Sequence, residues 1–251
     1  MNKLKNTVLM LFTTCLLSAN IAAAYSNEDL EIVLNGGNCV GGDLSGADLS
    51  NLDLSGRDFS GTDLTQARLS GAKMNNANLN DAVLRHAILF NTSLRHASLK
   101  NTDFTMALAK QADFTNANLS RAKLYRAQLQ GAQFLNANLT EVHAKEASFD
   151  NIKADYADFS FSNLPFTWLR NASLKSATFY GANIYLSKLQ QANLTDADCR
   201  SAKMSKANLR KAVLDGAKFD KAMLEKADLR GASIKYTEFG TAFLNGAELD
   251  K

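Results

Sequence analysis

The stretch LSGADLSNLDLSGRDFSGTDLTQARLSGAKM, residues 44–74, repeats one pattern every five residues. The same phase continues without a slip from Leu44 to Leu249, through 42 positions of which 34 are Leu or Phe. Two residues before these positions, Ala occupies 30 of the 42 sites. A fixed repeat over most of a chain indicates a solenoid.

A period of five suits neither of the common secondary structures. In an α-helix, successive units would be turned by about 500°, so the Leu positions would not form a stripe. In a strand, Ala47 and Leu49 share a face, but the next small residue lies three positions further on and would point the other way. The chain must therefore turn a corner once per unit. Both the small and the large side chain of each unit then lie inside a coil.

Units such as Gly46-Ala47-Asp48-Leu49-Ser50 resemble the consensus A-(D/N)-L-x-x of the pentapeptide-repeat family. The match covers about 205 of the 251 residues. The resemblance implies an all-β, right-handed quadrilateral β-helix with four units, or twenty residues, in each coil.

Weak internal support for four sides comes from the phenylalanines. Phe159, Phe179, Phe219 and Phe239 share one twenty-residue register, with Cys199 in the missing place. The units would form between ten and eleven coils and, at ~4.8 Å per coil, a rod roughly 50 Å long. Gly recurs two residues after the Leu/Phe position, where it suits tight corners, and the only proline is Pro165.

Residues 1–24 have the features of a secretory signal peptide. Lys3 and Lys5 precede an apolar run, residues 8–17, and Ala22-Ala23-Ala24 offers a cleavage site. The run is too short for a membrane span, although an uncleaved anchor stays open as an alternative. We therefore expect an exported protein, periplasmic or secreted, that is not an integral membrane protein once processed.

Residues 25–41 are predicted to form an N-terminal cap and residues 42–251 the β-helix. Ser26 and Asp29 have the spacing of a capping box, so we expect a short helix over residues 26–35, ended by Gly36-Gly37. The helix would cover the first coil. No comparable cap is predicted after the repeats, which favours a homodimer formed through the uncapped C-terminal coil.

Charge is distributed unevenly along the chain. The sequence has 28 basic and 25 acidic residues, a net charge of +3. Residues 25–65 hold eight acids and one base, whereas residues 200–235 hold ten bases and four acids. Two interpretations stay open: a solvated surface with chance asymmetry, or a surface that contacts a polyanion or a second copy head to tail.

The stretch from Glu141 to Leu186 is the least regular part of the repeat. Ala144 and Ala154 replace the large residue, and Phe149 between them is expected to fill part of the space. Several aromatic residues stand at outward positions here and form a candidate partner-binding patch. The alternative is that a kink at Pro165 lets them pack locally. The patch consists of Tyr156, Phe161, Phe166, Trp168, Tyr180 and Tyr185.

No catalytic, cofactor-binding or metal-binding constellation is apparent, so we predict no enzyme and no cofactor. Cys39 and Cys199 would lie eight coils apart, too far for a disulfide. His86, His96 and His143 are read as surface residues. Asp residues recur in the repeat itself, so pairs of carboxylates are weak evidence for acid–base chemistry.

These features predict an exported, non-enzymatic scaffold or protein-interaction solenoid whose protein partner the sequence does not identify. The alternative comes from the resemblance, because some pentapeptide-repeat proteins imitate DNA and protect topoisomerases from quinolones. A DNA mimic should be strongly acidic, and a signal peptide would remove it from cytoplasmic enzymes. Binding to nucleic acid is not expected.

Overall fold

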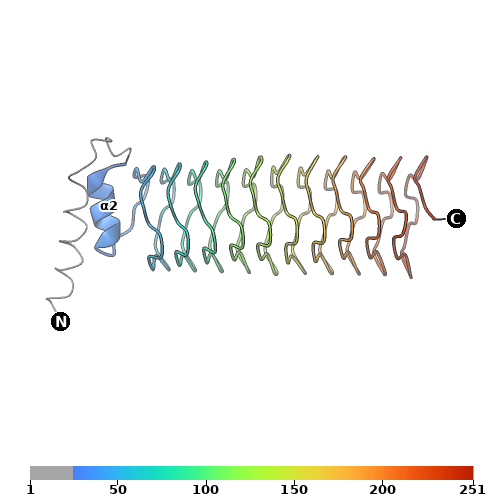
Figure 1. Ribbon diagram of the computed structural model, residues 1–251, viewed down its shortest axis with the longest axis horizontal. Coiled ribbons are helices and arrows are strands. Elements are labelled where there is room, and N and C mark those ends of the chain that lie inside the picture. Colours follow the sequence, from blue (N-terminus) through green and yellow to red (C-terminus); the bar gives the residue numbers. More distant parts are fainter. Residues whose placement is uncertain (1–24, 251) are drawn as a thin grey trace.

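Each five-residue unit forms one side of a square coil. A computed structural model describes residues 25–250, so the predicted signal peptide lies outside the described residues. Parallel bridges pair residues twenty apart, from Asp43 with Asp63 to Asp228 with Glu248. Four units therefore complete one coil, and Figure 1 shows the coils stacked into a straight rod. The prediction of a right-handed quadrilateral β-helix is confirmed.

Every corner is a tight turn with one residue at positive φ. In the first repeat, the N–H of Ala47 donates to the carbonyl of Leu44 over 3.0 Å, and Gly46 has φ of 74°. The same conformation is imposed on residues other than glycine, such as Asn51 at 60° and Lys226 at 57°. It disfavours L-residues by about 1–2 kcal/mol. The ladder offsets that cost, since Lys226 donates its N–H to Asn245 in the next coil over 3.0 Å.

The interior is mostly apolar and is filled from both the small and the large position of the repeat, with a few buried hydroxyls such as those of Thr62 and Ser187. Ala47 and Leu49 are each fully buried. The predicted phenylalanine column is confirmed. The rings of Phe159 and Phe179 stack with centroids 4.9 Å apart, and those of Phe219 and Phe239 at 5.6 Å. Offset stacking of this kind adds to the burial of apolar area.

Phe149 packs where the two small residues leave room. Ala144 and Ala154 flank it in the same coil, and all three side chains are fully buried. Its ring contacts Phe134 and Phe159 edge-on, with centroids 6.0 and 6.4 Å apart. The expected exchange of large and small residues therefore keeps the interior filled.

Helix α2, Asn27–Leu34, lies across the first coil (Figure 1). Its N-cap is Ser26, whose hydroxyl accepts the N–H of Asp29 over 3.2 Å. The helix ends at the predicted pair of glycines. Gly36 has φ of 95°, and the N–H of Gly37 donates to Ile32 over 2.8 Å, a Schellman arrangement.

Only half of the expected capping box forms. The carboxylate of Asp29 does not return to the N–H of Ser26; it accepts the N–H of Asp43 over 2.8 Å. Ser26 instead donates to the carbonyl of Asp43 over 2.9 Å. A Cβ on Gly42 would lie 2.8 Å from Cγ of Asp29, so the glycine leaves the space that this contact needs. The predicted box failed because the first coil competes for the carboxylate.

The chain shows no kink at Pro165. Its neighbours keep their ladder bonds, Leu164 to Asn183 over 2.7 Å and Phe166 to Tyr185 over 2.9 Å. One coil on, Tyr185 uses the corresponding N–H for the side chain of Asn183 rather than for the ladder. Proline thus occupies a position where the ladder needs no donor. Local packing around a kink does not explain the exposed aromatic residues.

The last coil is less covered than the others. Ile234 and Leu249 stand at interior positions of the repeat, yet 40% and 44% of their surfaces are exposed. Equivalent residues in the preceding coils, such as Leu214 and Leu229, are 0% and 2% exposed. Apolar surface of this coil is therefore exposed in the described part of the chain.

Candidate partner-binding surface

The predicted aromatic patch is divided over several parts of the rod. One pair lies on one edge: the rings of Phe161 and Tyr180 meet edge-on with centroids 5.5 Å apart. Phe161 is 62% exposed and lies over Gly181, where a Cβ would come within 3.0 Å of the ring. The absence of a Cβ at Gly181 therefore lets the aromatic ring approach the backbone of the next coil closely.

A second pair lies on the next edge. The rings of Phe166 and Tyr185 are 5.9 Å apart at an interplanar angle of 85°. Phe166 is 41% exposed, and Tyr185 is half-buried. Trp168 follows on the adjacent face and is 41% exposed.

Tyr156 is set apart from this group. It is 62% exposed and stands at the corner one unit before that of Phe161. Among the described residues, its ring makes no aromatic contact with the other five. The structure thus brings together two ring pairs and Trp168, and leaves Tyr156 on a separate edge.

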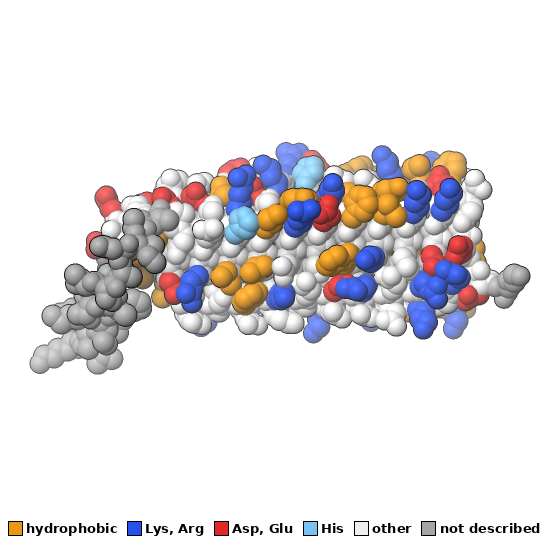
Figure 2. Space-filling model, turned by 45° about the horizontal axis from the view of Figure 1, so that its top comes forward, with side chains coloured by type: hydrophobic (Ala, Val, Ile, Leu, Met, Phe, Trp, Pro, Cys, Tyr) orange, Lys and Arg blue, Asp and Glu red, His pale blue; other side chains and the backbone are white. Residues whose placement is uncertain are grey.

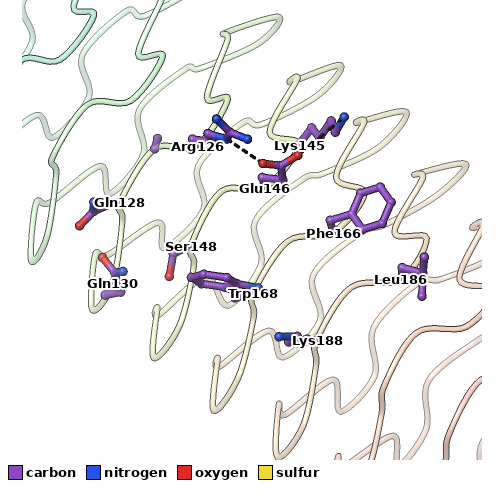
Figure 3. A pocket seen from close by; sticks show the side chains of 11 residues that line it. Arg126, Gln128, Gln130, Lys145, Glu146, Ser148, Phe166, Trp168, Leu186 and Lys188 are labelled. Carbon is purple, nitrogen blue, oxygen red and sulfur yellow. Dashed lines mark hydrogen bonds and ion pairs between the residues drawn. The ribbon is translucent and has the colours of Figure 1, made fainter.

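The face that carries Trp168 also carries a groove, and we call it the groove face. Its central column runs through Gln128, Ser148, Trp168 and Lys188, which successive bridges link. The groove has a volume of about 700 Å³. Figure 3 shows its side chains, which come from four coils. The lining residues are Arg126, Ala127, Gln128, Gln130, Lys145, Glu146, Ser148, Phe166, Trp168, Leu186 and Lys188.

Two polar atoms in the groove are buried without a partner among the described residues. They are Oγ of Ser148 and Oε1 of Gln130. Ser148 is 3% exposed. Buried polar groups are normally hydrogen-bonded, and an orphaned one is costly. A ligand that hydrogen-bonds to these atoms would remove that cost.

Lys and Arg side chains lie over four of the six aromatic rings of the predicted patch and over Tyr125, at 4.9 to 5.9 Å from the ring centroids. Figure 2 shows hydrophobic and basic side chains side by side along the rod. Each pair gains a cation–π attraction. The pairs are Arg126 with Tyr125, Lys145 with Phe166, Arg170 and Lys188 with Trp168, Arg200 with Tyr180, and Lys206 with Tyr185.

The groove carries more positive than negative charge. Arg126, Lys145 and Lys188 line it against a single acid, Glu146. Glu146 pairs with Arg126 over 2.7 Å and with Lys145 over 3.7 Å. The hydrogen bond from Arg126 lowers the pKa of Glu146. Within residues 25–250, Lys188 forms no ion pair, so its charge is available to a ligand.

The sequence prediction missed the polar half of this surface. It singled out Trp168 and Phe166 but not Gln128, Gln130 or Ser148, which are ordinary outward residues of the repeat. The twenty-residue register would have placed Gln128, Ser148, Trp168 and Lys188 in one column. The depth of the groove follows from side-chain length, because a short serine stands between long neighbours.

The cysteines and histidines form no site in the described part of the chain. Cys39 and Cys199 are free and buried. Burial raises the pKa of both thiols, which lowers their reactivity. No group of three His, Cys, Asp or Glu side chains between residues 25 and 250 is arranged to hold a metal ion. No helix in the same range is long and apolar enough to cross a membrane.

Comparison with known proteins agrees with the coil geometry. The family description "Pentapeptide repeats" matches residues 31–66, 43–81, 132–165, 155–191 and 192–231, and "Pentapeptide repeat region" matches residues 63–134. These matches cover most of the chain. It belongs to the pentapeptide-repeat family. No curated protein sequence matches it.

Several solved structures are similar. HetL, a pentapeptide-repeat protein involved in heterocyst differentiation regulation in the cyanobacterium Nostoc sp. strain PCC 7120, is 30% identical. The match covers 89% of this chain and 96% of HetL, with a TM-score of 0.43. A trypsin-treated variant of QnrB1, a plasmid-mediated fluoroquinolone resistance protein, is 21% identical over 80% of this chain and 90% of its own, with a TM-score of 0.51. At that identity, the likeness to QnrB1 concerns the fold.

Proposed function

We propose that this protein is an exported, non-enzymatic solenoid that binds a protein partner through its aromatic and cationic surface. The observation that carries the proposal is the clustering of exposed Phe161, Phe166, Trp168 and Tyr180 within neighbouring coils. Aromatic and Arg side chains dominate the energetics of protein interfaces. Large apolar side chains exposed in neighbouring places on a soluble protein often mark such an interface.

The rigid fold supports a scaffolding role. Every coil is tied to the next by ladder hydrogen bonds on all four sides, so outward side chains are held at fixed spacings. The interior is mostly apolar and closely filled, so a partner would be contacted by the outward side chains. A rigid surface loses little conformational entropy when it binds.

The test is site-specific photo-cross-linking in the producing cell. A photoreactive phenylalanine analogue replaces Phe161 or Phe166, and the same analogue at Asn76 is the matched control. Asn76 is exposed and has the same corner conformation, with φ of 58°. We expect a discrete adduct from Phe161 and Phe166 but not from Asn76. Identical adducts from all three positions, or none from any, would contradict the proposal.

Export is tested separately by cell fractionation and sequencing of the mature N-terminus. We expect a periplasmic or secreted chain that begins near Tyr25. A cytoplasmic chain that retains Met1 would overturn this part of the proposal. It would also reopen the DNA-mimic alternative, which the acidic stretch of residues 25–65 favours and the net charge of +3 opposes.

The DNA-mimic alternative has its own assay. The purified protein is added to a DNA gyrase supercoiling reaction inhibited by a fluoroquinolone. We expect no recovery of supercoiling. Recovery at protein concentrations comparable to that of gyrase would favour the alternative.

A further inference from the structure

The backbone groups of Ser148 and Trp168, at the floor of the groove, already form hydrogen bonds between coils. Ser148 donates its N–H to Ala127 over 2.9 Å, and its carbonyl accepts the N–H of Leu129 over 2.8 Å. Trp168 is bound in the same way to Ala147 and Phe149, over 3.1 and 2.6 Å. A ligand cannot bind here by adding a strand, which would need free backbone groups. Recognition must come from the side chains.

The side chains offer three kinds of contact. Oε1 of Gln130 and Oγ of Ser148 are unpartnered acceptors that suit a donor such as a peptide N–H. Lys188 and Lys145 supply positive charge on opposite sides of Phe166 and Trp168 in the coil order. Phe166, Trp168 and Leu186 supply apolar surface between these charges.

The placement of the cations argues against a stacked sugar. Lys188 and Arg170 lie over the ring of Trp168 at 5.4 and 5.9 Å, and Lys145 lies over Phe166 at 5.9 Å. A sugar ring needs a free aromatic face on which to lie. With cations over the rings, the surface suits carboxylates beside an apolar side chain.

We propose that the groove binds an extended, acidic segment of a partner protein with an apolar anchor residue. The carboxylates of the segment pair with Lys145 and Lys188. Its apolar side chain lies between Phe166 and Trp168, and its backbone N–H groups donate to Gln130 and Ser148. This inference rests on the proposed function and adds the chemistry of the partner.

The test starts from a random-peptide display library selected on the purified protein. We expect enrichment of Asp and Glu around Leu, Phe or Trp. The best peptide is then synthesised, and its affinity for each variant is measured by fluorescence anisotropy. We expect K145E/K188E and, independently, W168A to weaken binding by about tenfold or more.

The matched control is K203E/K218E. It makes the same change in net charge, but on two exposed lysines that lie on other faces of the rod than the groove face. We expect its affinity to stay within about twofold of the parent protein, because distant surface charges are screened. Thermal unfolding of each variant establishes that the coil is intact; W168A keeps the test valid should the charge reversal fail to fold.

Four outcomes would overturn the inference. The first is that no peptide is enriched, and the second is that K203E/K218E loses as much affinity as K145E/K188E. The others are a sulfated oligosaccharide that binds more tightly and alone displaces the peptide, and self-association of the protein that K145E/K188E abolishes. The last would make a second copy the occupant. If Phe161 or Phe166 cross-links to a partner but the library yields no peptide that binds the groove, this inference is wrong and the proposed function still holds.

Discussion

The residue that decides almost every corner is the second one after the interior Leu or Phe; after Phe239 it is the first, Gly240. Its φ is positive in unit after unit, and glycine fills it in only some of them. Elsewhere Asn, Lys, Arg and even Phe161 and Tyr156 adopt this conformation. At almost every corner before the last coil, the ladder bond that the corner N–H donates to the following coil helps to hold these residues there. The repeat therefore tolerates varied surfaces at its corners, which is where the aromatic pairs stand.

Lys226 offers a direct test of this balance. It is exposed, has φ of 57° and forms no ion pair within residues 25–250. We expect Lys226→Val to lower the free energy of unfolding by about 1 kcal/mol, because a β-branched residue at positive φ is strained more than the unbranched lysine that it replaces. Lys226→Gly should leave the free energy unchanged or slightly higher. Urea unfolding followed by circular dichroism measures both.

The control for Lys226 is Lys218→Val on an extended face. Valine suits a strand position, so little change is expected there. Equal destabilisation by valine at both positions would show that the corner conformation is not the cause.

At the scale of elements, α2 and the first coil act as one unit. The helix has a single fully buried side chain, Val33, so apolar packing alone holds it weakly. Hydrogen bonds to the first coil and from Arg57 supply further stabilisation. Asp29 accepts the N–H of Asp43, and Arg57 donates to the carbonyl of Val33 over 2.6 Å. These bonds also close the open edge of the first coil.

Removing the carboxylate of Asp29 should loosen the cap. We expect Asp29→Ala to lower the free energy of unfolding by about 1.5–3 kcal/mol, since it leaves the N–H of Asp43 without a charged acceptor. Glu28→Ala removes an exposed acid from the same helical turn and should cost about 0.3–1 kcal/mol. Amide hydrogen exchange at residues 27–44 measures the difference. Equal effects of the two changes would contradict the assigned role of Asp29.

The carboxyl groups in the turns also make the stability of the protein depend on pH. The hydroxyl and the N–H of Ser60 lower the pKa of Asp58, and Ser55 does the same for Asp53. Hydrogen bonds from Arg230 lower the pKa of Asp228 to about 2, from 3.8. A carboxyl group whose pKa falls on folding stabilises the protein above its unfolded pKa and loses that contribution as pH drops.

We therefore expect stability to be level above about pH 4 and to fall between about pH 4 and 2. Thermal unfolding across this range measures the loss. Asp228→Asn should reduce the slope, because one of the titrating groups is gone. A midpoint that stays constant down to pH 2 would show that the turns do not supply this linkage.

At the scale of the whole molecule, the two ends differ. α2 covers the first coil, whereas Ile234 and Leu249 in the last coil are 40% and 44% exposed. We propose that this coil associates with another copy, because exposed coil edges and apolar surface are typical of such contacts. A pair of rods joined at this end would present two aromatic surfaces to a partner, which raises the apparent affinity.

We expect light scattering of the purified protein to give the mass of a dimer. I234D/L249D should give a monomer, because charges would replace the apolar contact surface. Lys235→Asp, an exposed change in the same coil, should leave the dimer intact. A parent protein that stays monomeric at all concentrations would rule out the dimer.

The bend once per unit could be predicted from the sequence because its cause is local: one small and one large apolar residue in every five must both be buried. The number of sides was implied by the resemblance to the pentapeptide-repeat family, with weak support from the register of Phe159 and Phe179. The limits of α2 followed in the same way from Ser26 and Gly36. Such features depend on neighbours within a few residues, which the sequence shows directly.

Only the tertiary structure decided how residues twenty or more apart meet. Asp29 binds Asp43 rather than its own helix because the first coil brings that N–H close. Lys188 lies over Trp168, and Ser148 lies buried without a partner, because adjacent coils place side chains of unequal length side by side. The sequence thus determined the rod through repeated local burial. The groove and its charges arose from contacts between coils, whose geometry depends on every side chain in the column.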